Sequence, residues 1–288
     1  MVSGILCSTV TPFGDSDAID MAAYARHLKH LHLAGCKGVV VNSVTGEGAT
    51  LTAAERAECV AAARDVARND WCVLACVGTG DPSDLLSDAA AAEASGADGL
   101  FVAAPPVDDV FQLTAVMSEV RQASSLPTIL YNKQSSAPWT PAHLAIIVRE
   151  VPGVVGIAEG NFAQLAQTVR QVGAQAKVYC TRDSYIEAAA AAGAAGAVSF
   201  VANVDSASVV GLWRAIESGE PDAASFLQGR IAELVNALLA QNLTASLKAA
   251  MNQLQMRGGR VRPPLSELAA SDVAQLVSLL GDRQKVHS

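Results

Sequence analysis

The stretch Ala34-Gly35-Cys36-Lys37-Gly38-Val39-Val40-Val41 has a pattern that occurs three times in this chain. The other copies are Ser95-Gly96-Ala97-Asp98-Gly99-Leu100-Phe101-Val102 and Ala192-Gly193-Ala194-Ala195-Gly196-Ala197-Val198-Ser199. In each copy a glycine ends a predicted helix, two residues follow, and a second glycine begins a buried strand. The first two copies are separated by about two strand–helix units, as strands 2 and 4 of an eightfold barrel would be. The pattern therefore predicts repeated junctions from a helix into a parallel strand.

Short apolar runs alternate with longer alanine-rich segments of helical period along most of the chain. There are eight such runs, at residues 5–10, 38–41, 73–77, 99–102, 128–131, 154–158, 177–180 and 197–201. Helix-start signals stand between them: Asp20 before 21–34, Thr52 before 53–68 with Glu55 at the capping-box spacing, Asp81-Pro82 before 83–95, and Thr140-Pro141 before 142–150. The pattern predicts an α/β fold, a (β/α)8 TIM barrel. The alternative is an open doubly wound sheet, but no glycine-rich phosphate-binding sequence follows the first run.

The strand pattern stops after residue 201, and the remaining segment has helical periodicity. Helices are predicted at 207–218, 223–241, 244–256 and 265–280, with Pro263-Pro264 separating the last two. We therefore divide the chain into a barrel, residues 1–205, and a C-terminal helical region, residues 206–288. An apolar stripe on these helices is expected to pack on the barrel or on a neighbouring subunit.

Composition excludes several classes of protein. The chain has 288 residues, of which 51% are hydrophobic and 17% charged, so it can bury one large core. A formal charge of −8 and a pI near 5.1 argue against a nucleic-acid or anionic-membrane partner. No apolar run reaches the ~18 residues of a membrane span. The six cysteines stand singly in apolar runs, which indicates buried, reduced thiols and a cytoplasmic location rather than a disulfide framework.

In a barrel, catalytic residues belong at the carboxyl ends of the strands. Polar groups stand there after the second, fifth, sixth and seventh runs: Asn42 to Gly48, Tyr131-Asn132, Ala158-Glu159 and Thr181-Arg182-Asp183. The turn Ser43-Val44-Thr45-Gly46 offers hydroxyls and backbone N–H groups suited to a carboxylate. An ordinary polar turn has the same composition, so the residues alone leave both interpretations open.

Other polar residues of the chain receive structural interpretations. His27, His30 and His32 share an early helix, but no carboxylate lies at ligand spacing, so no metal site is predicted. Glu159 follows an inward-facing position and should point outward to the helix layer. Arg182 and Asp183 either form an ion pair within their loop or contact the distal end of a substrate.

Five motifs resemble the dihydrodipicolinate synthase / N-acetylneuraminate lyase family, in order and at the right spacing from about residue 4 to 280. They are Thr11-Pro12-Phe13; Val44-Thr45-Gly46-Glu47 with Leu51-Thr52 and Glu55; Leu126-Pro127 with Tyr131-Asn132; Gly156-Ile157-Ala158-Glu159; and Gly196-Ala197-Val198-Ser199. The resemblance implies a (β/α)8 barrel with a C-terminal helical region, in a tetramer or dimer. It also implies a carbon–carbon lyase, a class I aldolase, that acts on a small 2-keto acid such as pyruvate and an aldehyde without a separate cofactor.

Site roles also follow from the resemblance. Tyr131 matches the tyrosine that moves protons, Thr45 with Ser43, Val44 and Gly46 matches the carboxylate cradle, and Val198 matches a backbone contact to pyruvate. Ala158 occupies the position of the lysine that forms a Schiff base with the ketone. A methyl group cannot attack a ketone, so the chain as it stands should lack this chemistry.

Three explanations of Ala158 remain open. It is an introduced substitution that inactivates the enzyme, or a natural loss in a protein that binds keto acids as a sensor or catalyses a lysine-independent reaction. In the third, Lys133 replaces the missing amine from the fifth strand, which requires its side chain to turn inward and lose solvent.

Departures from the family pattern concern the second substrate. Family members that make dihydrodipicolinate have a hydroxyl residue where Val44 stands, an arginine near the position of Ser136, and a tyrosine where this chain has Pro105-Pro106-Val107. Losing that arginine removes a bidentate partner for a substrate carboxylate. We therefore expect a different aldehyde, bulkier or less charged, on which Trp139 either stacks or is simply packed.

Overall fold

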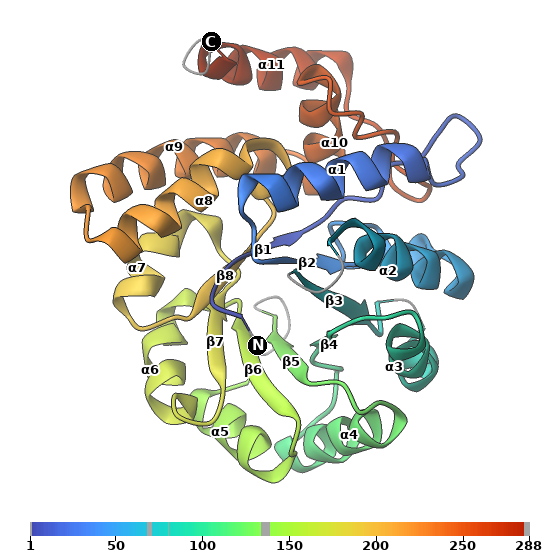
Figure 1. Cartoon of the computed structure of the whole chain (residues 1–288), viewed down its shortest axis with the longest axis vertical. Helices are drawn as coiled ribbons and strands as arrows, with labels where there is room; N and C mark the ends of the chain where they lie inside the picture. The colour runs from blue at the N-terminus through green and yellow to red at the C-terminus, as the bar shows by residue number, and fades with distance from the viewer. Residues whose placement is uncertain (1, 68–70, 80, 134–138, 285–288) are drawn as a thin grey trace.

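The computed structural model describes residues 2–67, 71–79, 81–133 and 139–284 of the chain. Eight parallel strands close into a barrel in the order of the sequence, β1 to β8, with β8 paired to β1. Figure 1 shows helices α1 to α8 around the strands and the last helices stacked on one side, over α1 and α8. The predicted TIM barrel is confirmed, and the open-sheet alternative is wrong because β1 and β8 are hydrogen-bonded.

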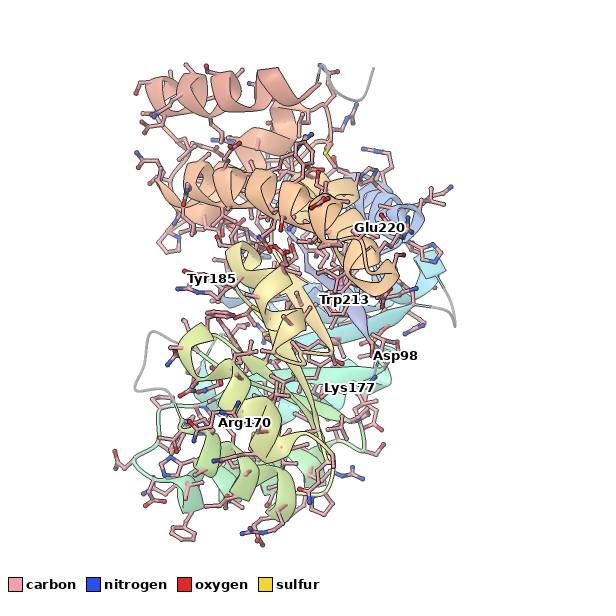
Figure 2. All side chains as sticks on the ribbon, turned by 90° about the vertical axis from the view of Figure 1, so that its left-hand side faces the viewer. Asp98, Arg170, Lys177, Tyr185, Trp213 and Glu220 are labelled. Carbon is pink, nitrogen blue, oxygen red and sulfur yellow. The ribbon has the colours of Figure 1, made fainter. Side chains whose placement is uncertain are left out.

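The strands coincide with the predicted runs to within two residues at each end. They are β1 Gly4–Ser8, β2 Gly38–Val41, β3 Cys72–Val77, β4 Gly99–Ala103, β5 Thr128–Asn132, β6 Val154–Glu159, β7 Lys177–Cys180 and β8 Gly196–Ser199. Figure 2 looks across the barrel, with Lys177 at the start of β7 and Tyr185 beyond its end on opposite sides. The carboxyl ends of the strands therefore meet on the side of Tyr185.

The two glycines of the repeated junction have different structural reasons. Gly35, Gly96 and Gly193 all have positive φ, between 90° and 98°, which is the left-handed conformation that ends a helix. Gly38 and Gly196 lie where neighbouring strands approach closely, and a Cβ would come within 2.1 Å of a backbone oxygen of the adjacent strand. Both glycines are thus required, one by dihedral angle and one by space.

Capping residues predict the starts of four barrel helices, and three of these begin within one residue of the prediction. The helices of the barrel are α1 Met21–Ala34, α2 Ala53–Ala67, α3 Leu85–Ala94, α4 Val110–Ala123, α5 Pro141–Glu150, α6 Phe162–Val172, α7 Ile186–Ala191 and α8 Ala202–Ser218. Thr52 and Glu55 form the predicted reciprocal capping box, with N–H to oxygen distances of 2.8 and 3.2 Å. The exception is α3, because Pro82–Asp84 form a 3-10 turn before it.

The C-terminal region contains α9 Pro221–Leu239, α10 Leu243–Gln253 and α11 Ala270–Gln284. Two predicted starts among the last four helices are wrong: the helix predicted from residue 207 is α8, which begins at Ala202, and the helix predicted from residue 265 is α11, which begins at Ala270. Helix α9 packs along α8, and α10 contacts α8, α9 and α11. The C-terminal helices therefore pack on the barrel. The division of the chain at residue 205 stays a prediction; Asp205 lies inside α8, at a kink where its backbone is not helical.

Alternation along the strands separates two hydrophobic cores. On β3, Cys72, Leu74 and Cys76 face the barrel interior with residues of other strands. Val73, Ala75 and Val77 belong to the larger core between the strands and the helices. All six cysteines are buried and free, as the sequence predicted.

Membrane-spanning helices and metal-binding clusters are both absent from the described ranges. None of the helices there is long and apolar enough to cross a membrane. Among the same residues, no group of three or more His, Cys, Asp or Glu side chains could hold a metal ion.

Candidate active site

Ala158 lies at the bottom of the candidate site, inside the barrel near the end of β6. It is fully buried among the hydrophobic side chains that face the barrel interior, here called the inner cluster. Tyr131 packs against the same side chains. In the β5–β6 pairing, Tyr131 is the partner of Ala158, so the two side chains are neighbours across the strands. A longer side chain at position 158 would therefore lie in the barrel interior next to Tyr131.

Tyr131 is half-buried, and its ring lies 5.4 Å from that of Phe101, centroid to centroid. Burial raises the pKa of the Tyr131 phenol, while the Thr181 hydroxyl and the charge of Arg182 act in the opposite direction. The phenol is therefore protonated at neutral pH and can donate a proton. Thr181 and Arg182 directly follow β7, the strand on the other side of β6.

Three hydroxyl groups gather at the ends of β1 and β2. The Ser8 hydroxyl lies 2.7 Å from that of Ser43 and donates to Thr45 Oγ1 at 3.2 Å. The backbone N–H of Gly46 donates to Ser43 Oγ at 3.4 Å, and the Thr11 hydroxyl donates to the Gly46 carbonyl at 2.8 Å. Ser43 and Thr45 are more than nine-tenths buried. Such a group of hydroxyls and amides can accommodate a carboxylate.

The loop that carries these hydroxyls has an unusual backbone at both ends. Asn42 and Glu47, neither of them glycine, have φ of 61° and 57°. Such left-handed residues cost roughly 1–3 kcal/mol each and persist only where their surroundings fix them. The Asn42 side chain is fixed because its Nδ2 donates to the Arg56 carbonyl at 2.9 Å.

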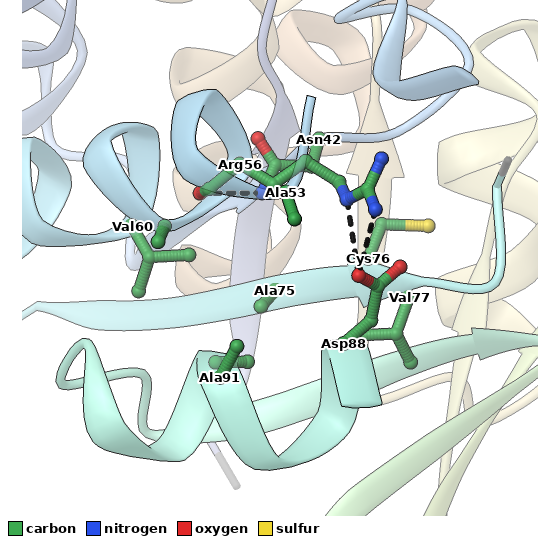
Figure 3. Close-up of a pocket in the computed structure, with 11 residues that line it drawn as sticks. Asn42, Ala53, Arg56, Val60, Ala75, Cys76, Val77, Asp88 and Ala91 are labelled. Carbon is green, nitrogen blue, oxygen red and sulfur yellow. Dashed lines mark hydrogen bonds and ion pairs between the residues drawn. The ribbon is translucent and has the colours of Figure 1, made fainter. Parts of the chain in front are cut away.

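Arg56 is itself held on the outside of the barrel, between α2 and α3. Its Nε and Nη2 donate to Asp88 Oδ1 at 3.1 and 2.9 Å, and Nη1 donates to the Leu51 carbonyl at 2.6 Å. Figure 3 shows this pair bordering a small cavity. The cavity measures about 10 Å³, which is room for one water molecule at most, so it is not a substrate pocket. The Arg56–Asp88 pair instead supports the loop.

Comparison with known proteins identifies the family. The sequence matches the Dihydrodipicolinate synthetase family over residues 1–282. The chain belongs to this family. It is 35% identical to 4-hydroxy-tetrahydrodipicolinate synthase 1 of Streptomyces coelicolor over 96% of this chain and 92% of that protein. It is 31% identical to 4-hydroxy-tetrahydrodipicolinate synthase of an Anaeromyxobacter species, over 97% and 98% of the two chains.

Solved structures of dihydrodipicolinate synthase family proteins share the fold. A monomeric dihydrodipicolinate synthase variant superposes with a TM-score of 0.93 at 24% identity, covering 98% of this chain and 97% of that one. YagE, an Escherichia coli K12 prophage protein solved with pyruvate, gives 0.92 at 24% identity, with 98% of each chain covered. These likenesses show that the chain has the same (β/α)8 fold as the two proteins. The predicted tetramer or dimer stays a prediction.

Two predicted site residues differ in their surroundings. Val198 is 7% exposed and belongs to the same inner cluster as Ala158, on β8, which is separated from β6 by β7. Val44 is 68% exposed, so its side chain is turned away from the buried hydroxyls that flank it in the sequence. Residue 44 can therefore contribute to the carboxylate cradle only through its backbone.

Glu159 points to the helix layer, as predicted. Its carboxylate accepts from Asn132 Nδ2 at 3.2 Å, and from Gln164 Nε2 and Thr168 Oγ1, both on α6, at 3.1 Å. It also accepts from the Asn161 backbone at 2.9 Å. Burial raises the pKa of Glu159 although these donors oppose it. The residue joins β5, β6 and α6 and is not a base in the site.

Arg182 and Asp183, predicted either to form an ion pair or to contact a substrate, have different surroundings in the structure. The Asp183 carboxylate is buried and accepts from the Ser199 hydroxyl and from the Phe200 backbone, so it fixes the β8–α8 turn. Arg182 is exposed and influences Tyr131 from the rim of the barrel. Contact between Arg182 and a substrate stays a prediction.

The remaining alternatives concern the segment after β5. Lys133 is exposed, so it does not meet the requirement for a desolvated amine. Trp139 packs edge-on against His143, with centroids 5.7 Å apart, and its backbone is bonded to the Asn132 side chain, which indicates a packing role. Ser135, Ser136 and their neighbours from 134 to 138 lie outside the described residues.

Two residues of the site were not predicted from the sequence. They are Ser8, whose hydroxyl joins those of Ser43 and Thr45, and Glu47, whose carboxylate is buried in the loop. The sequence placed Ser8 inside the first apolar run, residues 5–10, and only the observed end of β1 at Ser8 puts it where the criterion that selected Tyr131 applies. The partners of Glu47 come from the C-terminal region, and no local signal links them to it.

Proposed function

We propose that this chain is the scaffold of a pyruvate-dependent aldolase or lyase that is inactive because position 158 lacks the amine of its Schiff-base lysine. In the active form, a lysine amine at this position adds to the ketone of a 2-keto acid and loses water to give a protonated imine. That imine withdraws electrons, so a carbon–carbon bond next to the former ketone can be cleaved or formed through an enamine.

The observation that carries this proposal is the pairing of Ala158 with Tyr131 across β5 and β6, both packed in the inner cluster. An amine placed there would be largely desolvated, which lowers the pKa of a lysine and favours its nucleophilic form. Tyr131, protonated at neutral pH, is placed to transfer a proton to the oxygen that leaves as water. The Ser43 and Thr45 hydroxyls are proposed to hold the keto-acid carboxylate together with Gly46 and the backbone of Val198.

The test is borohydride trapping with pyruvate on the Ala158→Lys variant, the unmodified chain and an Ala158→Met control of similar side-chain length. We expect an adduct only in Ala158→Lys, located on residue 158 by peptide mapping. Adding Tyr131→Phe should slow trapping by about 100-fold or more, the usual contribution of a positioned proton donor.

Two outcomes would count against the proposal. A folded Ala158→Lys variant without an adduct would exclude position 158 as the nucleophile's place. An adduct on Lys133 of the unmodified chain would show that the amine has moved to β5 instead. Pyruvate binding to the unmodified chain, measured by calorimetry, separates an inactive enzyme that retains its cradle from one that has lost substrate affinity.

A further inference from the structure

The C-terminal region supplies two cations to the loop that carries the Ser43 and Thr45 hydroxyls. Lys248 on α10 places its Nζ 2.5 Å from Glu47 Oε1, and both side chains are fully buried. The backbone N–H of Arg262, between α10 and α11, donates to Glu47 Oε2 at 2.8 Å. Each oxygen of this one carboxylate is therefore held by a residue more than 200 positions away in the sequence.

Arg262 extends the same contact along the loop. Its Nη1 donates to the Thr50 carbonyl at 2.9 Å, and its Nη1 and Nη2 bond the Glu55 carboxylate at 3.0 and 2.7 Å. This guanidinium lowers the pKa of Glu55 to about 2. The C-terminal region thus contacts the loop at Glu47, at Thr50 and at the start of α2.

Phe13, in the loop after β1, lies between the two cations. Its ring centroid is 4.2 Å from Lys248 Nζ and 4.1 Å from Arg262 Cζ, both within cation–π range. The Phe13 carbonyl accepts from the Arg260 backbone at 3.1 Å, and Lys248 Nζ donates to the Arg260 carbonyl at 2.6 Å. The loops after β1 and β2, which contribute Thr11 and the Ser43 and Thr45 hydroxyls, are joined here to one segment of the C-terminal region.

This arrangement explains the left-handed backbone of Glu47. A non-glycine residue keeps such a conformation only when its environment enforces it, and the carboxylate of Glu47 is fixed on both oxygens. Glu47 lies between two glycines whose backbone N–H groups bond Ser43. The N–H of Gly46 donates to the Ser43 hydroxyl, and the N–H of Gly48 donates to the Ser43 carbonyl at 2.9 Å. Release of the carboxylate would free the turn on which Ser43 and Thr45 are mounted.

We propose that Lys248 and Arg262 are positioning residues for the keto-acid site, which hold the Ser43–Thr45 turn in its binding conformation through Glu47. The assignment of a ligand to this turn rests on the proposed function, whereas the mechanical coupling does not. Neither cation touches the ligand. Lys248 acts through the Glu47 carboxylate by its ammonium group, and Arg262 acts through it by its backbone N–H.

The experiment measures the coupling in two ways. Lys248→Met and the charge-neutral pair Glu47→Gln with Lys248→Met are compared with the unmodified chain and with Arg260→Met as a matched control. Arg260 is a cation of the same segment, but its side chain is exposed and pairs only loosely with Glu267, at 3.8 Å. Hydrogen exchange of residues 43–50 reports the turn without any ligand, and calorimetry reports the Kd for pyruvate.

We expect Lys248→Met to speed exchange in residues 43–50 by at least 10-fold and to raise the pyruvate Kd by a similar factor. Exchange in β5 should be unchanged, and Arg260→Met should resemble the unmodified chain. If Lys248→Met does not fold, the neutral double variant serves the same purpose, because it leaves no buried unpaired charge. Unchanged exchange of residues 43–50 in folded variants would overturn the inference.

The two proposals fail separately. Faster exchange in the turn, with no measurable pyruvate binding to the unmodified chain or to Ala158→Lys, would support the positioning role and overturn the proposed ligand. A lower melting temperature with unchanged Kd and unchanged exchange of residues 43–50 would show that Lys248 is a merely structural residue.

Discussion

His27 on α1 shows how one buried side chain makes stability depend on pH. The ring is 3% exposed, and its Nε2 lies 2.9 Å from the Asn203 side-chain oxygen, which also accepts from the Val10 backbone. Burial lowers the pKa of His27 to about 4, with His30 acting in the same direction and Asn203 against it. Between pH 6.5 and 4 the unfolded chain therefore binds a proton at this residue that the folded chain does not.

We predict that His27 makes the protein lose stability as the pH falls from about 6.5 to 4, by about 1.4 kcal/mol per pH unit. Asp183 opposes this, because burial raises its pKa to about 7 and the folded state then holds the extra proton. The comparison must therefore be made with His27→Gln, in which the Asp183 contribution is unchanged. Urea unfolding at several pH values gives the difference; parallel curves for the two proteins would contradict the prediction.

At the scale of single elements, the loop after β2 and helix α9 provide a matched pair of glycines. A Cβ on Gly48 would lie 1.9 Å from the Asn42 carbonyl oxygen, and this backbone atom cannot move without disturbing the loop. Gly229, inside α9, has nothing within 4 Å of its Cβ position.

We predict opposite effects of the same substitution at these two sites. Gly48→Ala should lower the free energy of unfolding by about 1–3 kcal/mol through steric strain. Gly229→Ala should raise it by about 0.5–1 kcal/mol, because alanine restricts the unfolded chain and favours the helix. Urea midpoints of the two variants decide the matter: a raised or unchanged midpoint for Gly48→Ala would refute the steric account of the loop, and a lowered midpoint for Gly229→Ala would refute the helix argument.

At the scale of the whole molecule, the Lys248–Glu47 pair joins the C-terminal region to the barrel through two fully buried charges. Removing one partner leaves the other charge buried without compensation, so Lys248→Met or Glu47→Gln alone should cost about 3–5 kcal/mol. The double variant should cost clearly less than the sum of the two. Urea unfolding of the four proteins tests this, and additive losses would show that the two groups are not coupled.

The sequence by itself determined the barrel, because its evidence is local. Glycine pairs, capping residues such as Thr52 and short apolar runs each act within one helix–strand unit, and eight repeats of that unit leave few ways to bury the strands. The same locality placed Tyr131 and Ala158 at the ends of strands. The start of α11 was misplaced because the apolar spacing from 265 onward continues the helical period before the helix begins.

Only the tertiary structure decided which groups meet at the site. Ser8 ends β1 and Ser43 lies in the loop after β2, and Val44 is turned outward by the path of that loop, which no period in the sequence records. The two groups that hold the Glu47 carboxylate, the Lys248 ammonium and the Arg262 backbone N–H, come from α10 and from the segment that follows it. Contacts of this range depend on how α8 to α11 pack on the barrel, and packing is a property of the assembled molecule rather than of any one segment.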